Sequence, residues 1–235
     1  MTASDRSGKP NDRGPAVRRF ESLPQDASID RYFDALKDAT LEYYLADPAN
    51  PYRQSGRSSG HQRWQESRRC IAEAVHRDGT FLDVGCANGL LLESLERWLA
   101  PRSITIEPHG IDFVPELVEL ARERLSHVER ANFHVANVWE WSPPRQYEFV
   151  RTNLDYVPEH AWSEWVTRQW GRLVAPGGRM ILCWYYSSHE AGQPHQSPAR
   201  FLEGLGLAAA GATAALGTEV AWTDKPAASP KGETP

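Results

Sequence analysis

The sequence of 235 residues contains little cysteine. Its three cysteines, Cys70, Cys86 and Cys183, are an odd number and lack the paired spacing of a structural metal site. This pattern excludes a disulfide framework as the basis of the fold and predicts free thiols, which are typical of cytoplasmic proteins. No cluster of histidine and aspartate suggests a catalytic divalent ion, so no metal is expected.

Long apolar runs and an excess of positive charge are also absent. No stretch approaches the roughly 20 apolar residues of a membrane-spanning helix, and the first ten residues lack the apolar core of a signal peptide. The net charge is −5, which argues against nucleic acid as the substrate. These absences predict a cytoplasmic protein that does not insert into membranes.

The segment 80–91 (TFLDVGCANGLL) is the most informative part of the sequence. A short apolar run contains Asp83, passes through a turn with Gly85 and Gly89, and enters a leucine-rich stretch. This pattern predicts a strand, a tight turn and the start of a helix, the arrangement with which parallel sheets bind nucleotide-type ligands. An ordinary strand-to-helix turn is the alternative. Ala87 replaces the second glycine of the dinucleotide motif G-x-G-x-x-G, so a nicotinamide dehydrogenase is disfavoured. The carboxylate of Asp83 favours a cationic ligand over a phosphate.

The remaining sequence alternates between the two types of secondary structure. Strands are predicted near 80–84, 109–113, 132–136, 147–152 and 179–185, with helices at 89–99, 115–126 and 159–173 between them. A short helix at 198–205 and two strands near 207–215 and 218–223 follow. This alternation predicts a doubly wound α/β fold with a mostly parallel sheet and helices on both faces.

The composition divides the chain into four parts. Residues 1–26 are predicted to be a disordered leader and residues 225–235 a flexible tail. Residues 27–60 are predicted to form a helix capped by Ser28 and a following loop, and residues 61–224 the core domain, which begins with a helix at 61–76.

Four segments resemble the motifs of one enzyme family in the right order. Residues 83–89 (DVGCANG) resemble the first motif, D/E-x-G-x-G/A-x-G, of class I S-adenosylmethionine-dependent methyltransferases. Residues 109–113, 133–138 and 173–182 resemble the second strand, the third strand with its loop, and the turn into the fifth strand. The resemblance covers about residues 60–224. It implies a Rossmann-like sheet of seven strands with a closing antiparallel strand, an N-terminal helical cap, and S-adenosylmethionine as methyl donor.

The resemblance also implies a set of residues that bind the donor. Residues 85–89 would line its methionine and ribose, and Asp112 would accept hydrogen bonds from the ribose hydroxyls, or else cap the helix that begins at Pro115. Asn137 would contact the adenine or serve as a turn residue. The full set is Arg53, Asp83, Gly85, Cys86, Ala87, Asn88, Gly89, Asp112, Phe113, Asn137, Val138 and Asn153.

Two features depart from the family pattern: the spacing after Gly85, and Asn137, which stands where the family often has Asp but still offers an acceptor for the adenine amino group. The gap from Gly85 to Asp112 is longer than the roughly 20 residues expected of a nucleotide fold, and the excess is assigned to a connection at residues 101–108. In the loop at 51–60, Arg53 is expected to pair with the methionyl carboxylate or to be solvated. The arginines at 57, 63, 68 and 69 could form a basic patch, but a solvated helix face is the preferred interpretation.

The sequence does not single out a general base. Each candidate has a structural alternative, because a sequence contains no geometry. The candidates are Asp155, Tyr156, Glu159 and His160 after the fourth strand, His61, and the pair Tyr185 and Tyr186.

The predicted function is methyl transfer (EC 2.1.1.-) to a small molecule, such as a metabolite or natural-product intermediate. Trp139 and Trp141 follow the adenine-binding loop, and aromatic walls suit a small, partly apolar or cationic acceptor. The alternatives are an RNA or protein methyltransferase and a non-catalytic protein that binds S-adenosylmethionine. The sequence does not specify the oligomeric state, and a homodimer is compatible with it.

Overall fold

The structure is a computed structural model that describes residues 23–56, 60–186 and 197–228. Most of the predicted leader and the end of the predicted tail lie outside the described residues. Among the described residues, none of the helices combines the length and the apolar character needed to cross a membrane.

A seven-stranded sheet runs through the molecule in the order β3-β2-β1-β4-β5-β7-β6. Its strands are β1 (Gly79–Val84), β2 (Ile106–Asp112), β3 (Phe133–Val135), β4 (Tyr147–Asn153), β5 (Val174–Tyr185), β6 (Gly211–Ala215) and β7 (Thr218–Asp224). The pairs β2–β3, β1–β2, β1–β4 and β4–β5 are parallel, whereas β7 is antiparallel to both β5 and β6. This topology confirms the predicted Rossmann-like sheet with a closing antiparallel strand.

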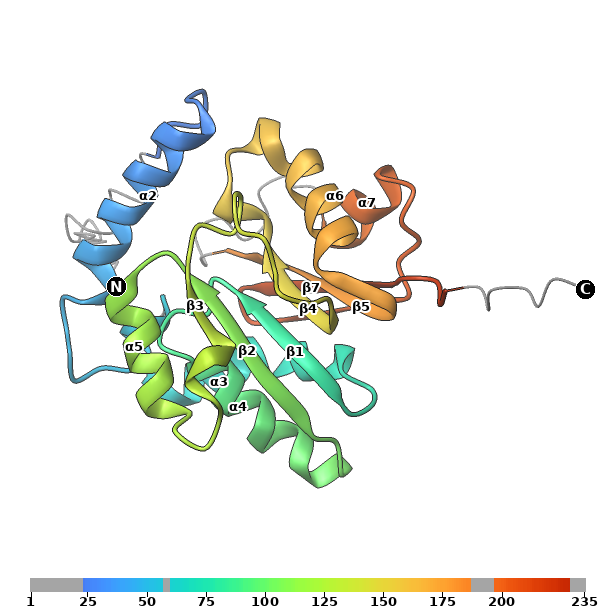
Figure 1. Ribbon diagram of the computed structural model, residues 1–235, viewed down its shortest axis with the longest axis horizontal. Helices are drawn as coiled ribbons and strands as arrows, with labels where there is room; N and C mark the ends of the chain where they lie inside the picture. The colour runs from blue at the N-terminus through green and yellow to red at the C-terminus, as the bar shows by residue number, and fades with distance from the viewer. Residues whose placement is uncertain (1–22, 57–59, 187–196, 229–235) are drawn as a thin grey trace, which may run out of the picture.

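Helices cover both faces of the sheet, as predicted. In Figure 1, α6 and α7 lie on one side of the sheet and α4 and α5 on the other. The helices are α2 (Ile29–Tyr44), α3 (Gly60–Arg68), α4 (Leu90–Leu99), α5 (Pro115–Arg124), α6 (Trp162–Arg172) and α7 (Pro198–Gly204). The short 3₁₀ helices are η1 (Arg53–Ser55), η2 (Arg69–Ala74), η3 (Ala100–Arg102), η4 (Arg130–Asn132), η5 (Leu154–Tyr156) and η6 (Glu159–Ala161).

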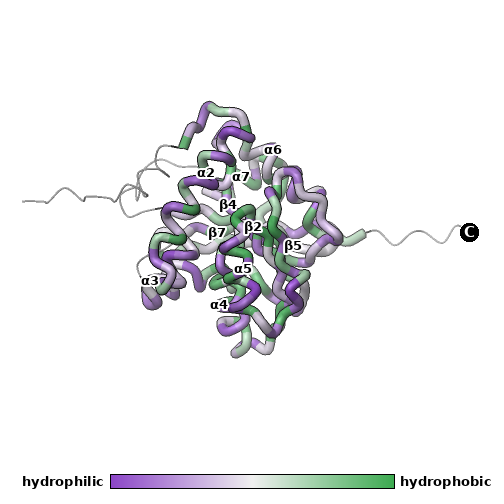
Figure 2. The backbone as a smooth tube through the Cα atoms, turned by 60° about the vertical axis from the view of Figure 1, so that its left-hand side comes forward, coloured by the Kyte–Doolittle hydropathy of each residue, from purple (hydrophilic) through white to green (hydrophobic). Residues whose placement is uncertain are grey.

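Alternating side chains of the central strands build two cores. Phe81 and Phe149 point to the core that includes α4, whereas Leu82 and Val150 point to the core that includes α6, because successive residues of a strand face opposite sides. In Figure 2, the helices alternate between hydrophilic and hydrophobic residues along the tube. The buried strands hold the sheet rigid and fix where each of them ends.

The N-terminal helix α2 forms the predicted helical cap. Ser28 accepts a hydrogen bond from the backbone N–H of Arg31 and so caps its first turn. Tyr32, Phe33 and Leu36 are buried in the same core as the residues of α6. The Tyr32 hydroxyl donates to the carbonyl oxygen of Asp155, 3.1 Å away, just after β4. Both contacts hold α2 beyond the carboxyl ends of the strands.

Several predicted boundaries are wrong. The helix predicted at 61–76 is the α-helix α3 followed by the 3₁₀ helix η2. Strand β2 begins at Ile106, which pairs with Gly79, so the end of the predicted connection at 101–108 belongs to the sheet. Strand β5 begins at Val174, ahead of an irregularity in its pairing with β4, and β6 is shorter than predicted.

The stability of the fold depends on the α4 core, and Leu95 tests this. Leu95 is fully buried in that core. Leu95→Ala is therefore expected to lower the free energy of unfolding by about 2 to 5 kcal/mol, because it leaves a cavity among close-packed side chains. Urea denaturation measures the change. The matched control is Leu216→Ala, because Leu216 is 42% exposed and is expected to change stability by about 0.5 kcal/mol or less. Equal losses in the two variants would contradict this assignment of the core.

Candidate active site

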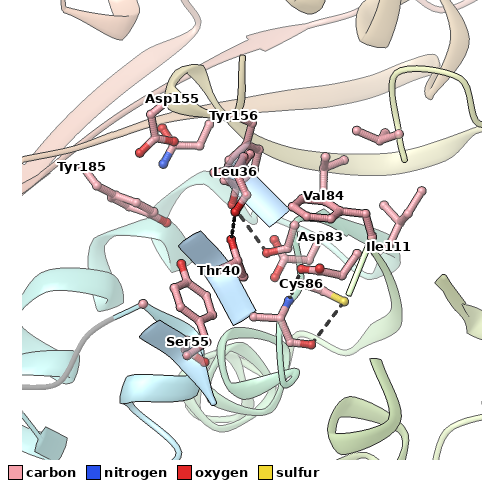
Figure 3. A pocket seen from close by; sticks show the side chains of 18 of the residues that line it. Leu36, Thr40, Ser55, Asp83, Val84, Cys86, Ile111, Asp155, Tyr156 and Tyr185 are labelled. Atoms are coloured by element: carbon pink, nitrogen blue, oxygen red, sulfur yellow. Dashed lines mark hydrogen bonds between the residues drawn. The ribbon is translucent and has the colours of Figure 1, made fainter. Parts of the chain in front are cut away.

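A cavity of about 490 Å³ lies at the carboxyl ends of β1, β2 and β4. Its floor includes Gly85 after β1, Asp112 at the end of β2 and Asn153 at the end of β4. Leu36 and Thr40 of α2 point into it from above (Figure 3). Open parallel sheets bind ligands at this edge, and the volume suits a small molecule.

The glycine-rich turn after β1 is fixed to the end of β2. The N–H groups of Gly85 and Cys86 donate to the carbonyl oxygen of Ile111 at 2.8 and 3.0 Å. The N–H of Ala87 donates to Asp112 Oδ2 at 2.9 Å. Ala87 has a φ of +47°, a conformation unfavourable for residues with a side chain. The hydrogen bond to Asp112 holds it there.

Asp112 is a buried carboxylate held by backbone groups. Its Oδ1 accepts from the N–H of Val114 at 3.0 Å, and Val114, rather than Asp112, is the N-cap residue of α5. Burial raises the pKa of Asp112 to about 6, while the hydrogen bonds from Val114 and Ala87 oppose this shift. A carboxylate has about four lone-pair sites, so with the further backbone hydrogen bond from Phe113 the group can still accept a hydrogen bond from a ligand.

A buried ion pair lies under the cavity. Arg151 Nη1 donates to Asp83 Oδ1 at 3.0 Å, and both side chains are almost fully buried. The same nitrogen donates to the Tyr156 hydroxyl at 2.9 Å, and Nη2 donates to the Tyr185 hydroxyl. Burial raises the pKa of Asp83 to about 6, although the Arg151 guanidinium opposes the shift. Burial also holds the pKa values of both tyrosines well above 10, so their hydroxyls remain protonated.

A second buried guanidinium, that of Arg68, lines the cavity. It stacks on the Tyr185 ring, 3.5 Å from the ring centroid, and Nη1 donates to Thr218 Oγ1 at 2.6 Å. Arg68 is 5% exposed. Within the described residues no carboxylate forms an ion pair with it. A buried cation of this kind suits an anionic ligand group.

Comparison with known proteins agrees with this geometry. Residues 81–178 match the family model described as "Methyltransferase domain". The chain is also similar to ubiquinone biosynthesis O-methyltransferase of Xanthomonas oryzae pv. oryzae, with 31% identity over 106 residues, 43% of this chain and 41% of that protein. The chain thus matches less than half the length of these relatives. Residues 81–178 are a class I S-adenosylmethionine-dependent methyltransferase domain.

Solved methyltransferases share the fold. The chain resembles Burkholderia thailandensis 1,6-didemethyltoxoflavin-N1-methyltransferase, with a TM-score of 0.58, 16% identity, and coverage of 85% of this chain and 91% of that one. It also resembles the N-methyltransferase NodS of Bradyrhizobium japonicum, with a TM-score of 0.54, 15% identity, and coverage of 81% and 98%. Both similarities extend beyond residues 81–178, so the fold is that of a methyltransferase over most of the chain.

Most of the predicted donor-binding residues line the cavity of the methyltransferase domain. These are Asp83, Gly85, Cys86, Ala87, Asp112, Phe113, Val138 and Asn153. Of the candidate bases, Asp155 and Tyr156 line it, as do Tyr185 and Tyr186. The structure brings these residues together from the ends of β1 to β5 and the loops that follow them.

The other four predicted donor-binding residues lie behind the cavity wall and shape it. Arg53 Nε donates to the Tyr43 carbonyl oxygen at 2.9 Å, so its side chain is directed along α2. Asn137 Oδ1 accepts from the backbone N–H two residues later at 3.0 Å, as in the turn alternative. Gly89 is the N-cap of α4, and a Cβ on it would lie 3.1 Å from that of Ala121 on α5. Asn88 is hydrogen bonded to the segment before α3.

Two candidate histidines also lie outside the cavity wall. His61 Nδ1 is 2.9 Å from the Tyr52 hydroxyl, and His160 Nδ1 is 3.1 Å from the carbonyl oxygen of Gln25. Both imidazoles are exposed. Glu159 opens η6 and is exposed as well.

Sequence reasoning missed the two arginines of the site. Arg68 is buried rather than part of a solvated face, although Arg63 and Arg69 beside it are exposed. The signal was its position four residues after Trp64, on the buried side of the same helix. Arg151 lies within the buried strand β4, opposite Asp83 in the register of β1. An acidic and a basic residue on neighbouring buried strands, here Asp83 and Arg151, indicate a buried ion pair.

Asp112 gives the methyltransferase domain a defined pH dependence. Its pKa is about 6 in the folded chain and 3.8 ordinarily, so between these values the folded state binds a proton that the unfolded state has lost. The free energy of unfolding is therefore expected to fall as pH rises from about 4 to about 6, by up to about 3 kcal/mol from this group, and then to stay level. Urea denaturation between pH 4 and 7.5 measures it.

The matched variants for this test are Asp112→Asn and Asp38→Asn. The amide of Asp112→Asn cannot ionise, so its profile should lose this part of the fall. Asp38 is an exposed carboxyl on α2, and its replacement should leave the profile of the wild type unchanged. Identical slopes in the wild type and Asp112→Asn would show that the Asp112 carboxyl does not titrate in this range.

Proposed function

We propose that this protein transfers the methyl group of S-adenosylmethionine to a small-molecule acceptor. One observation carries the proposal. The glycine turn, Asp112 and Phe113, which belong to the segment that matches a methyltransferase domain, line one end of a single cavity, and side chains of α2 line the other side. A donor at the turn and an acceptor beside α2 would then share one cavity.

The floor of the cavity suits the nucleoside part of the donor. Asp112 retains lone pairs toward the cavity and can accept hydrogen bonds from ribose hydroxyls. The Phe113 ring and the side chains of Ala136 and Val138 offer apolar surface for a purine base. At Gly85 the φ is +70°, and the absence of a side chain leaves room for the Tyr156 ring beside the turn, where its protonated hydroxyl borders the donor site.

The charged residues suit the methionyl part of the donor. That group is a zwitterion with a carboxylate and an ammonium group. The wall offers the guanidinium groups of Arg68 and Arg151 and the carboxylate of Asp83. Because Arg151 already pairs with Asp83, we assign the methionyl carboxylate to Arg68, where sequence reasoning assigned it to Arg53.

The bound donor would supply a methyl group on a positively charged sulfur. The chain's own task is to hold an acceptor atom in line with that methyl carbon, because positioning alone can account for a large part of such a rate enhancement. Trp165 and Tyr32 help to wall the acceptor side and limit the entry of water. The carboxylate of Asp155 is exposed beside the cavity and is the best-placed group to take a proton from the acceptor. The protonated hydroxyls of Tyr156 and Tyr185 can donate hydrogen bonds instead.

A small acceptor is favoured over RNA or protein by the roof of the cavity. Helix α2 covers the carboxyl ends of the strands. The hydroxyl of Tyr32 in α2 donates a hydrogen bond to the carbonyl oxygen of Asp155 in η5. A macromolecule would have to displace this helix to reach the turn. The similar proteins also support a small acceptor. One is named for ubiquinone biosynthesis, and the structure of another contains bound 1,6-didemethyltoxoflavin.

Calorimetry and a methyl-transfer screen test the proposed function. S-adenosylmethionine and S-adenosylhomocysteine are expected to bind, and NAD is not. Incubation with isotope-labelled donor and metabolite extracts is then expected to label a small molecule. Binding of the donor without label in any small molecule, RNA or protein would favour the non-catalytic alternative, and label in RNA or protein would overturn the small-molecule assignment.

Arg68→Ala tests the assignment of the methionyl carboxylate. Loss of a charge-assisted hydrogen bond is expected to weaken S-adenosylhomocysteine binding about 10- to 100-fold. Binding of 5′-methylthioadenosine, which lacks the amino acid part, should stay within about threefold and shows that the cavity is intact. Arg53→Ala is the matched control. If Arg53→Ala weakens S-adenosylhomocysteine binding and Arg68→Ala does not, the carboxylate pairs with Arg53, as the sequence alone suggested.

A further inference from the structure

The Asn88 side chain forms four hydrogen bonds behind the cavity. Its Nδ2 donates to the Pro51 carbonyl oxygen at 2.9 Å and to Gln54 Oε1 at 3.1 Å. Its Oδ1 accepts from the Ser55 hydroxyl and from the Leu90 N–H. A primary amide has two N–H donors and two acceptor lone pairs, so this side chain is saturated. Asn88 is fully buried and does not line the cavity.

Three of the four partners belong to the segment 51–56. This segment is attached on its other side to the end of α2. Arg53 Nε donates to the Tyr43 carbonyl oxygen, and a Cβ on Gly56 would lie 2.5 Å from the Tyr44 hydroxyl oxygen. Ser55 and Gly56 line the cavity together with Tyr43 and Tyr44. The segment therefore connects the glycine turn to the last turn of α2.

The position of Asn88 within the turn is itself fixed. It follows Ala87, whose N–H is bound by Asp112, and its own carbonyl oxygen accepts from Arg124 Nε on α5 at 2.9 Å. Leu36 and Thr40 of α2 also line the cavity (Figure 3). The placement of these roof residues depends on how the end of α2 is held.

We propose that Asn88 is a positioning residue that fixes α2 over the acceptor side of the cavity. Its amide ties segment 51–56, and through it the end of α2, to the turn where the donor binds. The inference rests on the proposed function, because it assigns the donor to that turn. Donor binding that orders the turn would then also order the end of α2 beside the acceptor. The coupling is reciprocal, so acceptor binding beside α2 would strengthen donor binding by the same factor. Asn88 acts on the acceptor side, whereas the sequence resemblance placed it on the donor.

Hydrogen exchange of the full chain, with S-adenosylhomocysteine as probe, tests this role. In the wild type, a saturating concentration of the probe is expected to slow exchange of the backbone amides of residues 36–56. In Asn88→Ala, exchange there is expected to be about tenfold faster without the probe, because the segment opens locally. The probe should bind within about threefold of the wild type, but it should no longer slow exchange in residues 36–56. A purely structural role would not separate binding from protection.

Two further variants keep the test decisive. Gln54→Leu removes one hydrogen-bond partner of Asn88 that does not line the cavity, and it should reproduce the faster exchange. This variant tests the proposal even if Asn88→Ala fails to fold. The double variant should match the single variants within about twofold, because both changes release the same segment. Asn132→Ala is the matched control, since Asn132 Nδ2 bonds the Pro108 carbonyl oxygen at the far edge of the sheet. It should leave exchange in residues 36–56 unchanged.

Each outcome decides the proposal. It is overturned if Asn88→Ala and Gln54→Leu leave exchange in residues 36–56 unchanged. It is also overturned if Asn88→Ala weakens binding of the probe more than tenfold and leaves exchange unaltered. That result would show that the Asn88 side chain contacts the donor. If the wild type binds no probe, the proposed function fails. The exchange rates without probe then still show whether Asn88 holds the segment.

Discussion

The arrangement of this site depends on the attachment of one turn to the neighbouring strand. The N–H groups of Gly85, Cys86 and Ala87 all point to the end of β2, two to the Ile111 carbonyl oxygen and one to the Asp112 carboxylate. These bonds compensate for the unfavourable backbone angle at Ala87. They place the glycine turn beside Asp112, and they also direct the Asn88 side chain away from the cavity toward the segment before α3. The attachment of this turn to β2 thus shapes the donor side of the cavity and also fixes the segment that holds the end of α2.

Charge is balanced beneath this turn by residues on adjacent central strands. The Asp83 and Arg151 side chains are both buried, and either one alone would be costly there. The Tyr156 and Tyr185 hydroxyls accept further hydrogen bonds from the two terminal nitrogens of the guanidinium. Arg68 adds a cation without a carboxylate partner among the described residues, so the cavity has an unbalanced charge at the end where the methionyl group is proposed to bind. The site is therefore prepared electrostatically before any ligand arrives.

The sequence predicted the sheet, the helical cap and most of the cavity floor, because these follow from local patterns. Alternating apolar runs mark strands, and the family motifs lie at strand ends. It misplaced the start of β2, since Glu107 and Pro108 interrupt the apolar pattern although their backbone still pairs with β1. It took Arg68 for a solvated residue, and it did not predict the hydrogen bonds of the Asn88 side chain to segment 51–56. Both depend on partners, Thr218 and segment 51–56, that are distant in the chain, and such pairings emerge only from the tertiary structure.

The contact between Gly85 and Tyr156 links two positions that are far apart in sequence. A Cβ on Gly85 would lie 2.6 Å from the Tyr156 ring, so a side chain at the first position would require the ring at the second to move. The two residues share a fixed volume, and growth at one requires loss at the other. Descendants of this chain should therefore change them together, and any redesign that aims to widen the site must treat the two as a single unit.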